Sequence, residues 1–179
     1  RKHGLTIDHV AAAEIVLADG RRVRADAGEN PDLYWAVRGA GANFGIVTAF
    51  ELDAYELGDV VFSTMIFDAS DAAGLLEAWG AAVEAAPREL TSSLNLSDGG
   101  GTPVAQIYNV YTSDDAEGAV AALSPLLEIG PVLAQRAHLV PYPAILPLQG
   151  ARHVGQPYHR VSAGLAEHIT PELAGELEG

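Results

Sequence analysis

The order of elements expected over residues 60–140 constrains the fold more than any other feature, because it repeats strand, helix, strand twice. Ser70 and Asp114 can cap the two helices, and a proline follows each helix. This order predicts an α+β fold with a split β-α-β, ferredoxin-like antiparallel sheet and helices on one face. The face of the sheet without helices must then be covered by another part of the protein or serve as a binding surface. The strands are expected at 60–67, 91–97, 104–112 and 132–140, and the helices at 70–86 and 114–128.

The residues before this repeat have a different pattern. Asp19-Gly20 is a turn dipeptide between two β-compatible segments, so residues 12–25 predict a hairpin. Apolar and polar residues alternate over 46–57, which indicates a half-exposed strand.

A short helix is expected between these elements, from Pro31 to about residue 38. Asn30 can cap it, Pro31 suits the first helical position, and Gly39 can end it in the left-handed conformation. We expect Trp35 in the core, because tryptophan is highly buried on average.

The stretch after this helix, GAGANFGIV, raises the question of a nucleotide-binding loop. Gly39, Gly41 and Gly45 are spaced G-x-G-x-x-x-G and lead from a helix into a strand. The dinucleotide fingerprint needs G-x-G-x-x-G leading from a strand into a helix, and a P-loop needs a following Gly-Lys-Ser/Thr. Two interpretations stay open: a plain turn, or a strand mouth whose amides at 43–47 meet a planar or anionic ligand.

The composition limits the classes of molecule that the chain is expected to bind. The formal net charge of −14 opposes binding to nucleic acid or to an anionic membrane, so a small molecule or a protein is expected. No apolar run approaches the ~20 residues of a membrane-spanning helix. There is no cysteine, and the six histidines have no metal-ligand spacing, so no metal site is expected. Oligomeric state is left open, and the cytoplasm is the expected location.

Four motifs occur in order along residues 3–48: His-Gly-Leu-x-x-Asp at 3–8, Ala-Asp-Gly at 18–20, Asn-Pro-Asp-Leu-x-Trp-Ala-x-Arg-Gly at 30–39 and Gly-x-Asn-Phe-Gly-Ile-Val-Thr at 41–48. This series resembles the second half of the FAD-binding domain of berberine bridge enzyme-like flavoprotein oxidases. These oxidases belong to the vanillyl-alcohol oxidase superfamily and have a PCMH-type FAD domain. The later residues are similar to the family's substrate domain, including Tyr142-Pro143. The resemblance implies domains at 1–57 and 58–179, the second incomplete at its C-terminus.

The resemblance also implies a function. The longer protein would be an FAD-dependent oxidoreductase that oxidises a C–H bond next to an alcohol or amine, with hydride transfer to flavin and molecular oxygen as acceptor. We expect the 179-residue chain by itself to be inactive, as a fragment without the other half of the flavin site. The implied FAD neighbours are Gly41, Asn43, Phe44, Gly45, Ile46, Val47 and Asp8; for Asp8 a local turn or cap is an equal alternative.

Catalytic residues are harder to assign. A base should project from the substrate sheet, and the strand VAQIYNVYT offers Tyr108 on one face and Asn109 and Tyr111 on the other. Tyrosine is also a common strand former, so packing is an alternative for each. His153 and His159 lie in an irregular loop, where a substrate entrance and a solvated loop are both open. A stand-alone α+β ligand-binding or interaction module is the alternative to an oxidase.

Overall fold

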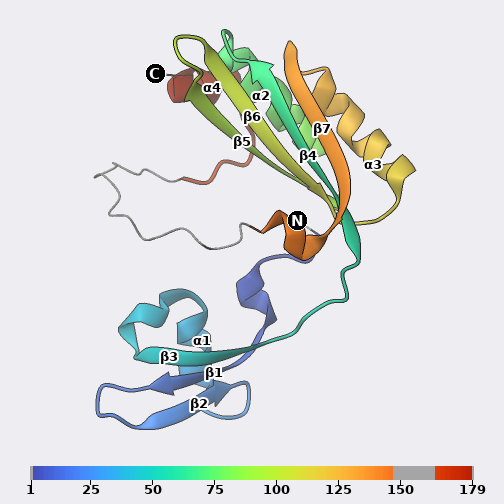
Figure 1. Cartoon of the computed structure of the whole chain (residues 1–179). Helices are drawn as coiled ribbons and strands as arrows, with labels where there is room; N and C mark the ends of the chain where they lie inside the picture. The colour runs from blue at the N-terminus through green and yellow to red at the C-terminus, as the bar shows by residue number, and fades with distance from the viewer. Residues whose placement is uncertain (1, 147–163, 179) are drawn as a thin grey trace. The chain divides into compact units, whose positions relative to one another are not determined.

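The computed structural model describes residues 2–146 and 164–178, and Figure 1 shows the chain. It divides into two compact units, unit 1 (Arg1–Glu56) and unit 2 (Leu57–Gly179). Among the described residues, no helix is long and apolar enough to cross a membrane.

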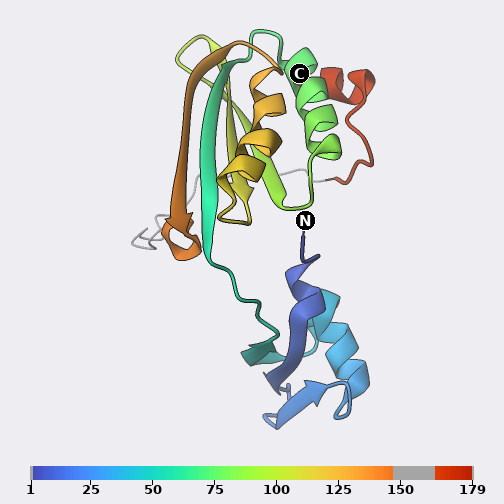
Figure 2. The same ribbon diagram turned by 90° about the vertical axis from the view of Figure 1, so that its right-hand side faces the viewer.

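Unit 2 contains one four-stranded sheet. Its strand order is β5-β6-β4-β7, and every neighbouring pair is antiparallel. Figure 2 shows both long helices on the same side of the sheet. The predicted ferredoxin-like arrangement is thus confirmed. The elements are β4 (Asp59–Asp68), α2 (Ala72–Ala85), β5 (Leu90–Asp98), β6 (Pro103–Tyr111), α3 (Ala116–Leu123), the short helices η3 (Ser124–Leu127) and η4 (Tyr142–Ile145), β7 (Val132–Pro141) and α4 (Pro171–Glu178).

The N-caps of α2 and α3 lie one residue later than the sequence suggested. Asp71 accepts a hydrogen bond from the Gly74 amide at 3.0 Å and caps α2, while Asp115 caps α3 in the same way. Ser70 was the expected cap of α2, but its amide and hydroxyl both donate to Asp68. An aspartate at the next position therefore takes over the role.

Unit 1 has a three-stranded antiparallel sheet in the order β2-β1-β3. The predicted hairpin is present, with Gly20 at a φ of 84° in its turn. One helix packs on the sheet over a small core of Ala13, Ile15 and Ala25. The elements are η1 (Thr6–His9), β1 (Val10–Val16), β2 (Arg22–Asp26), α1 (Pro31–Ala40), η2 (Gly41–Asn43) and β3 (Ile46–Leu52).

Two expectations about α1 were wrong. Trp35 is 79% exposed, because the helix turns Leu33, Tyr34 and Val37 toward the sheet and position 35 lies on the opposite side. Gly39 does not end the helix in the left-handed conformation: the backbone is non-helical at Arg38, with φ −78° and ψ 15°, and the helix continues across this kink to Ala40.

Two further boundaries differ from the sequence analysis. Asn30 precedes the helix, but its side chain donates to the Arg24 carbonyl at 2.7 Å instead of capping. The strand expected to reach residue 57 ends at Leu52.

An ion-pair network spans all three strands of unit 1. Arg24 on β2 reaches over the central strand β1 to Glu51 on β3, with an Nη2–Oε2 distance of 2.8 Å. Its Nε also donates to Asp26 at 2.8 Å. The hydrogen bonds from Arg24 lower the pKa of Glu51. Backbone amides, that of Glu29 first, together with Arg24 lower the pKa of Asp26.

This network predicts acid sensitivity of unit 1. A carboxylate with a lowered pKa contributes stability above its ordinary value of about 4, and this stability is lost as pH falls through the lowered pKa. We expect Arg24→Gln to reduce the thermal unfolding temperature at pH 7 and to flatten its dependence on pH below about 4. Circular dichroism melts from pH 7 to pH 2.5 measure both. Arg22→Gln, the same charge change on the same strand, serves as the control. Parallel pH curves for Arg24→Gln and the unsubstituted chain would contradict the prediction.

Candidate functional site

The residues that the resemblance implied as FAD neighbours form one continuous stretch at the start of β3. η2 carries Gly41 and Asn43, and β3 begins at Ile46. Phe44 is 43% exposed and Ile46 is 72% exposed, while Val47 packs against the small core. The stretch therefore presents backbone and apolar side chains, and no charged group, at one end of the unit 1 sheet.

Gly45 has a structural reason of its own. Its φ is 148°, and a Cβ placed there would lie 2.6 Å from the Val16 carbonyl oxygen and 2.8 Å from Cγ2 of Ile15. Glycine is required because β1 approaches so closely. The group that comes near the Gly45 backbone is thus the neighbouring strand.

Gly39 and Gly41 differ from Gly45. A Cβ at Gly39 would meet nothing within 4 Å, and one at Gly41 would meet only the Val37 Cβ at 4.0 Å. Neither has a positive φ. The fold of unit 1 does not demand glycine at either position, so these two fit a backbone that another group approaches closely. In this respect the stretch is compatible with FAD.

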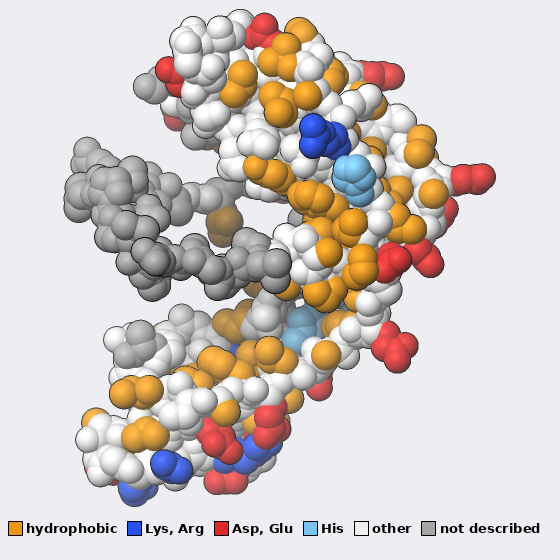
Figure 3. Space-filling model, in the orientation of Figure 1, with side chains coloured by type: hydrophobic (Ala, Val, Ile, Leu, Met, Phe, Trp, Pro, Cys, Tyr) orange, Lys and Arg blue, Asp and Glu red, His pale blue; other side chains and the backbone are white. Residues whose placement is uncertain are grey.

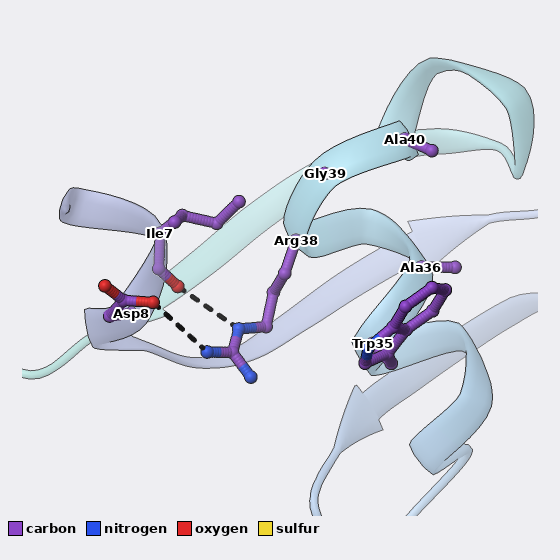
Figure 4. Close-up of a pocket in the computed structure, with 7 residues that line it drawn as sticks. All are labelled: Ile7, Asp8, Trp35, Ala36, Arg38, Gly39 and Ala40. Atoms are coloured by element: carbon purple, nitrogen blue, oxygen red, sulfur yellow. Dashed lines mark hydrogen bonds and ion pairs between the residues drawn. The ribbon is translucent and has the colours of Figure 1, made fainter. Parts of the chain in front are cut away.

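Asp8 lies in a separate pocket of about 380 Å³ beside the end of α1. Figure 4 shows the Arg38 guanidinium extending toward it. The Arg38 Nη2 atom is 3.8 Å from an Asp8 oxygen, and Nε donates to the Ile7 carbonyl at 3.2 Å. The guanidinium also lies 5.0 Å from the centre of the Tyr34 ring. Asp8 therefore helps to hold Arg38, a residue to which the sequence analysis gave no role. The remaining lining residues are Trp35, Ala36, Gly39 and Ala40.

The structure separates the tyrosines of β6. Tyr111 is 8% exposed and lies in the core beneath the helices. Burial raises the pKa of its hydroxyl, and the negative charges of Asp115 and Glu89 add to this effect. A tyrosine that is hard to deprotonate, and that faces the helices, is a packing residue rather than a base. Asn109 shares this covered side and is fully buried, and its side-chain amide has no hydrogen-bond partner among the described residues.

Tyr108 lies on the opposite side, which we call the open face because α2 and α3 leave it uncovered. Its ring stacks near Phe62, with centroids 6.4 Å apart. In the sheet register it stands between Ser93 on β5 and Thr64 on β4, and Thr64 is followed by Arg136 on β7. Residues of four strands that are distant in sequence thus form one polar row.

The open face carries both polar and apolar side chains and has a shallow depression of about 260 Å³. Figure 3 shows basic and histidine side chains over β7 on this face, with acidic side chains at its rim. The lining residues are Thr64, Ile66, Gln106, Ala134, Gln135 and Arg136. Sequence analysis missed them because only the strand register brings them together.

Other groups give no further site. Among residues 2–146 and 164–178, no three His, Asp or Glu residues are grouped so that they could hold a metal ion. His153 and His159 lie outside the described residues.

Comparison with known proteins identifies the relatives of this chain. It is 39% identical over 145 residues to the FAD-linked oxidoreductase tazL of Aspergillus terreus. This alignment covers 76% of this chain and 29% of that protein. It is 34% identical over 129 residues to a xylooligosaccharide oxidase of Thermothelomyces thermophilus, covering 71% and 26%. No protein-family model matches the chain.

Solved structures of the same kind of protein are also similar to this chain. A chitooligosaccharide oxidase superposes with a TM-score of 0.67 and 32% identity, over 79% of this chain and 30% of that one. BBE-like 1 of Physcomitrella patens gives a TM-score of 0.66 and 26% identity, over 79% and 31%.

Fold and relatives together define an α+β chain of the flavoprotein oxidase class with a PCMH-type FAD domain. Within that class, the chain belongs to the berberine bridge enzyme-like FAD-linked oxidoreductases of the vanillyl-alcohol oxidase superfamily. It spans less than a third of the length of the curated relatives it matches.

The fold requires glycine at Gly45 but not at Gly39, and this difference can be tested by the stability of two alanine variants. Gly45→Ala should destabilise unit 1 by about 1–3 kcal/mol, because the new methyl group meets the β1 backbone and the φ is unfavourable. Gly39→Ala should leave stability unchanged or raise it by up to about 1 kcal/mol, since alanine is the better helix former. Thermal and urea unfolding of the 179-residue chain measure both effects. Equal stability of the two variants would disprove the structural role of Gly45.

Proposed function

We propose that the chain is part of an FAD-dependent oxidase that removes hydride from a carbon bearing an alcohol or amine of a small molecule. The observation that carries the proposal is the match to FAD-linked oxidoreductases across both units. Because the chain corresponds to under a third of such proteins, the activity is proposed for the longer protein. We further propose molecular oxygen as the final electron acceptor.

Unit 1 would contribute one side of the FAD site. We assign this role to the backbone from Gly41 to Val47, with Gly39 and Gly41 leaving room for close approach. Backbone amides can bind an anionic or planar group without a charged side chain. FAD, when bound, supplies the hydride acceptor; the protein holds it and excludes water.

Unit 2 would bind the substrate on its open face. The hydroxyls of Tyr108, Thr64 and Ser93 and the amide of Gln106 stand at neighbouring register positions. Such groups suit a polyhydroxylated molecule, and the relatives include a xylooligosaccharide oxidase and a carbohydrate oxidase. We propose a carbohydrate-like substrate, with the Tyr108 hydroxyl bound to the substrate hydroxyl that loses its proton.

The stand-alone binding module is the weaker candidate. A module that shared only the ferredoxin-like layer would resemble the family in unit 2 alone. The similarity to tazL instead extends over 76% of the chain.

Cofactor binding tests the first part of the proposal. We expect the isolated 179-residue chain to retain no stable FAD, because it offers only part of the site. The longer protein that contains it should copurify with a yellow cofactor that is bleached anaerobically by its substrate. Absorption spectra from 350 to 500 nm of both proteins decide the matter. A colourless, FAD-free longer protein would rule the oxidase out.

The two tyrosines of β6 provide a matched pair for the second part. In the longer protein, Tyr108→Phe should lower kcat/KM by about 10- to 1,000-fold if its hydroxyl assists proton removal. Tyr111→Phe should change kcat/KM by no more than about twofold, because that hydroxyl faces the core. Steady-state oxygen uptake measures both. A larger loss for Tyr111→Phe than for Tyr108→Phe would reverse the assignment of the substrate face.

A further inference from the structure

Positive charge stands on the open face of a chain that is otherwise strongly acidic. The formal net charge is −14, yet β7 places Arg136 on this face. Among the described strand positions of the open face, the only carboxylate is Asp68, at the far end of β4. It lies about 13 Å along the strand from the position paired with Arg136, and it accepts hydrogen bonds from Ser70.

Arg136 has a free guanidinium within the part of the chain that the structure describes. It makes no ion pair or hydrogen bond with any described residue, in contrast to Arg24 and Arg38, which are each held by a carboxylate. It also lines the depression of about 260 Å³ together with Thr64 and Gln106. A cation with unused donors thus stands beside a hydroxyl and an amide in one concave place.

The chemistry of these groups differs from what a neutral sugar requires. Hydroxyl groups of a ligand are satisfied by Thr64 and Gln106, whereas removing a guanidinium from water without a counter-charge is costly. Arginine presents a planar fork that binds a carboxylate through two parallel hydrogen bonds. A depression smaller than a typical ligand pocket, which begins at about 300 Å³, suits a single acidic ring rather than a whole oligosaccharide.

We propose that this depression binds the carboxylate of an acidic sugar, or of a closely related hydroxy acid, and that Arg136 selects for it. The proposal rests on the proposed function for its assignment of the open face as the substrate surface. Thr64 and Gln106 bind the hydroxyls next to the carboxylate. The long-range field of the acidic chain repels anions, so selection depends on this local cation.

The test uses the longer flavoprotein and pairs of sugars that differ only at C6, where one carries a neutral hydroxymethyl group and the other a carboxylate, such as D-glucose with D-glucuronate and the corresponding disaccharides. A 6-phosphorylated sugar forms the third arm. Oxygen uptake gives kcat/KM, and titration calorimetry gives the dissociation constant independently of turnover. We expect the uronate to be the better ligand and its binding to weaken as salt is raised.

Arg136→Gln should reduce kcat/KM and affinity for the uronate about 10- to 100-fold and leave the neutral sugar within about twofold. Arg136→Lys should restore part of the affinity, because it keeps the charge but not the fork. Arg22→Gln, the same charge change in unit 1, should alter neither sugar. Equal melting temperatures of the Arg136 variants confirm that folding is intact.

Each outcome is decisive. Equal losses for both sugars, or a uronate that binds no better than its neutral partner, overturn the proposal while oxidase activity stands. Tighter binding of the phosphorylated sugar overturns the choice of carboxylate. If neither sugar is oxidised, the oxidase function fails for these substrates, but calorimetry still decides: uronate binding lost in Arg136→Gln supports the site, and binding that is absent or unchanged overturns it.

Discussion

The helices α2 and α3 both cover the same face of the unit 2 sheet. Because side chains alternate along each strand, neighbouring strand residues are divided between this buried face and the open face. Met65, Phe67 and Ile107 lie under the helices. Thr64, Gln106 and Tyr108, one position away along the same strands, stand on the open face. A shift of one residue in register would exchange the two sets, so packing of the core fixes which polar groups meet outside it.

The same constraint explains what the sequence could predict. The order of strands and helices in unit 2 follows from periodicity and end signals, which are local properties. The polar row from Ser93 to Arg136 is not local, because its members come from four strands and meet only through pairing. Tyr108 and Tyr111 could be placed on opposite faces from their spacing, but which face the helices cover required the structure.

In unit 1 the errors have a different origin. Trp35 was expected in the core from its residue type, although the helical period already sets it opposite Leu33 and Val37. For Gly45 the sequence left open a turn or a ligand contact, and the structure adds a requirement of its own, because β1 occupies the space on the Cβ side of this residue. Residue type alone was not enough at either position, and the tryptophan and the glycine need separate geometric explanations.

Unit 1 also depends on few interactions. Its core cluster contains three buried residues, against thirteen in the main core cluster of unit 2. Ile46, Phe50 and Leu52 on β3 are 72%, 53% and 51% exposed, so the strand that would carry the FAD contacts buries little apolar surface within the unit. Burial of such side chains is the main source of stability in a small fold. The strand mouth is therefore held by the pairing of β3 with β1 and by the fit of Gly45 against β1, while the Arg24–Glu51 bridge secures the other end of β3. A group that covers β3 would stabilise the unit.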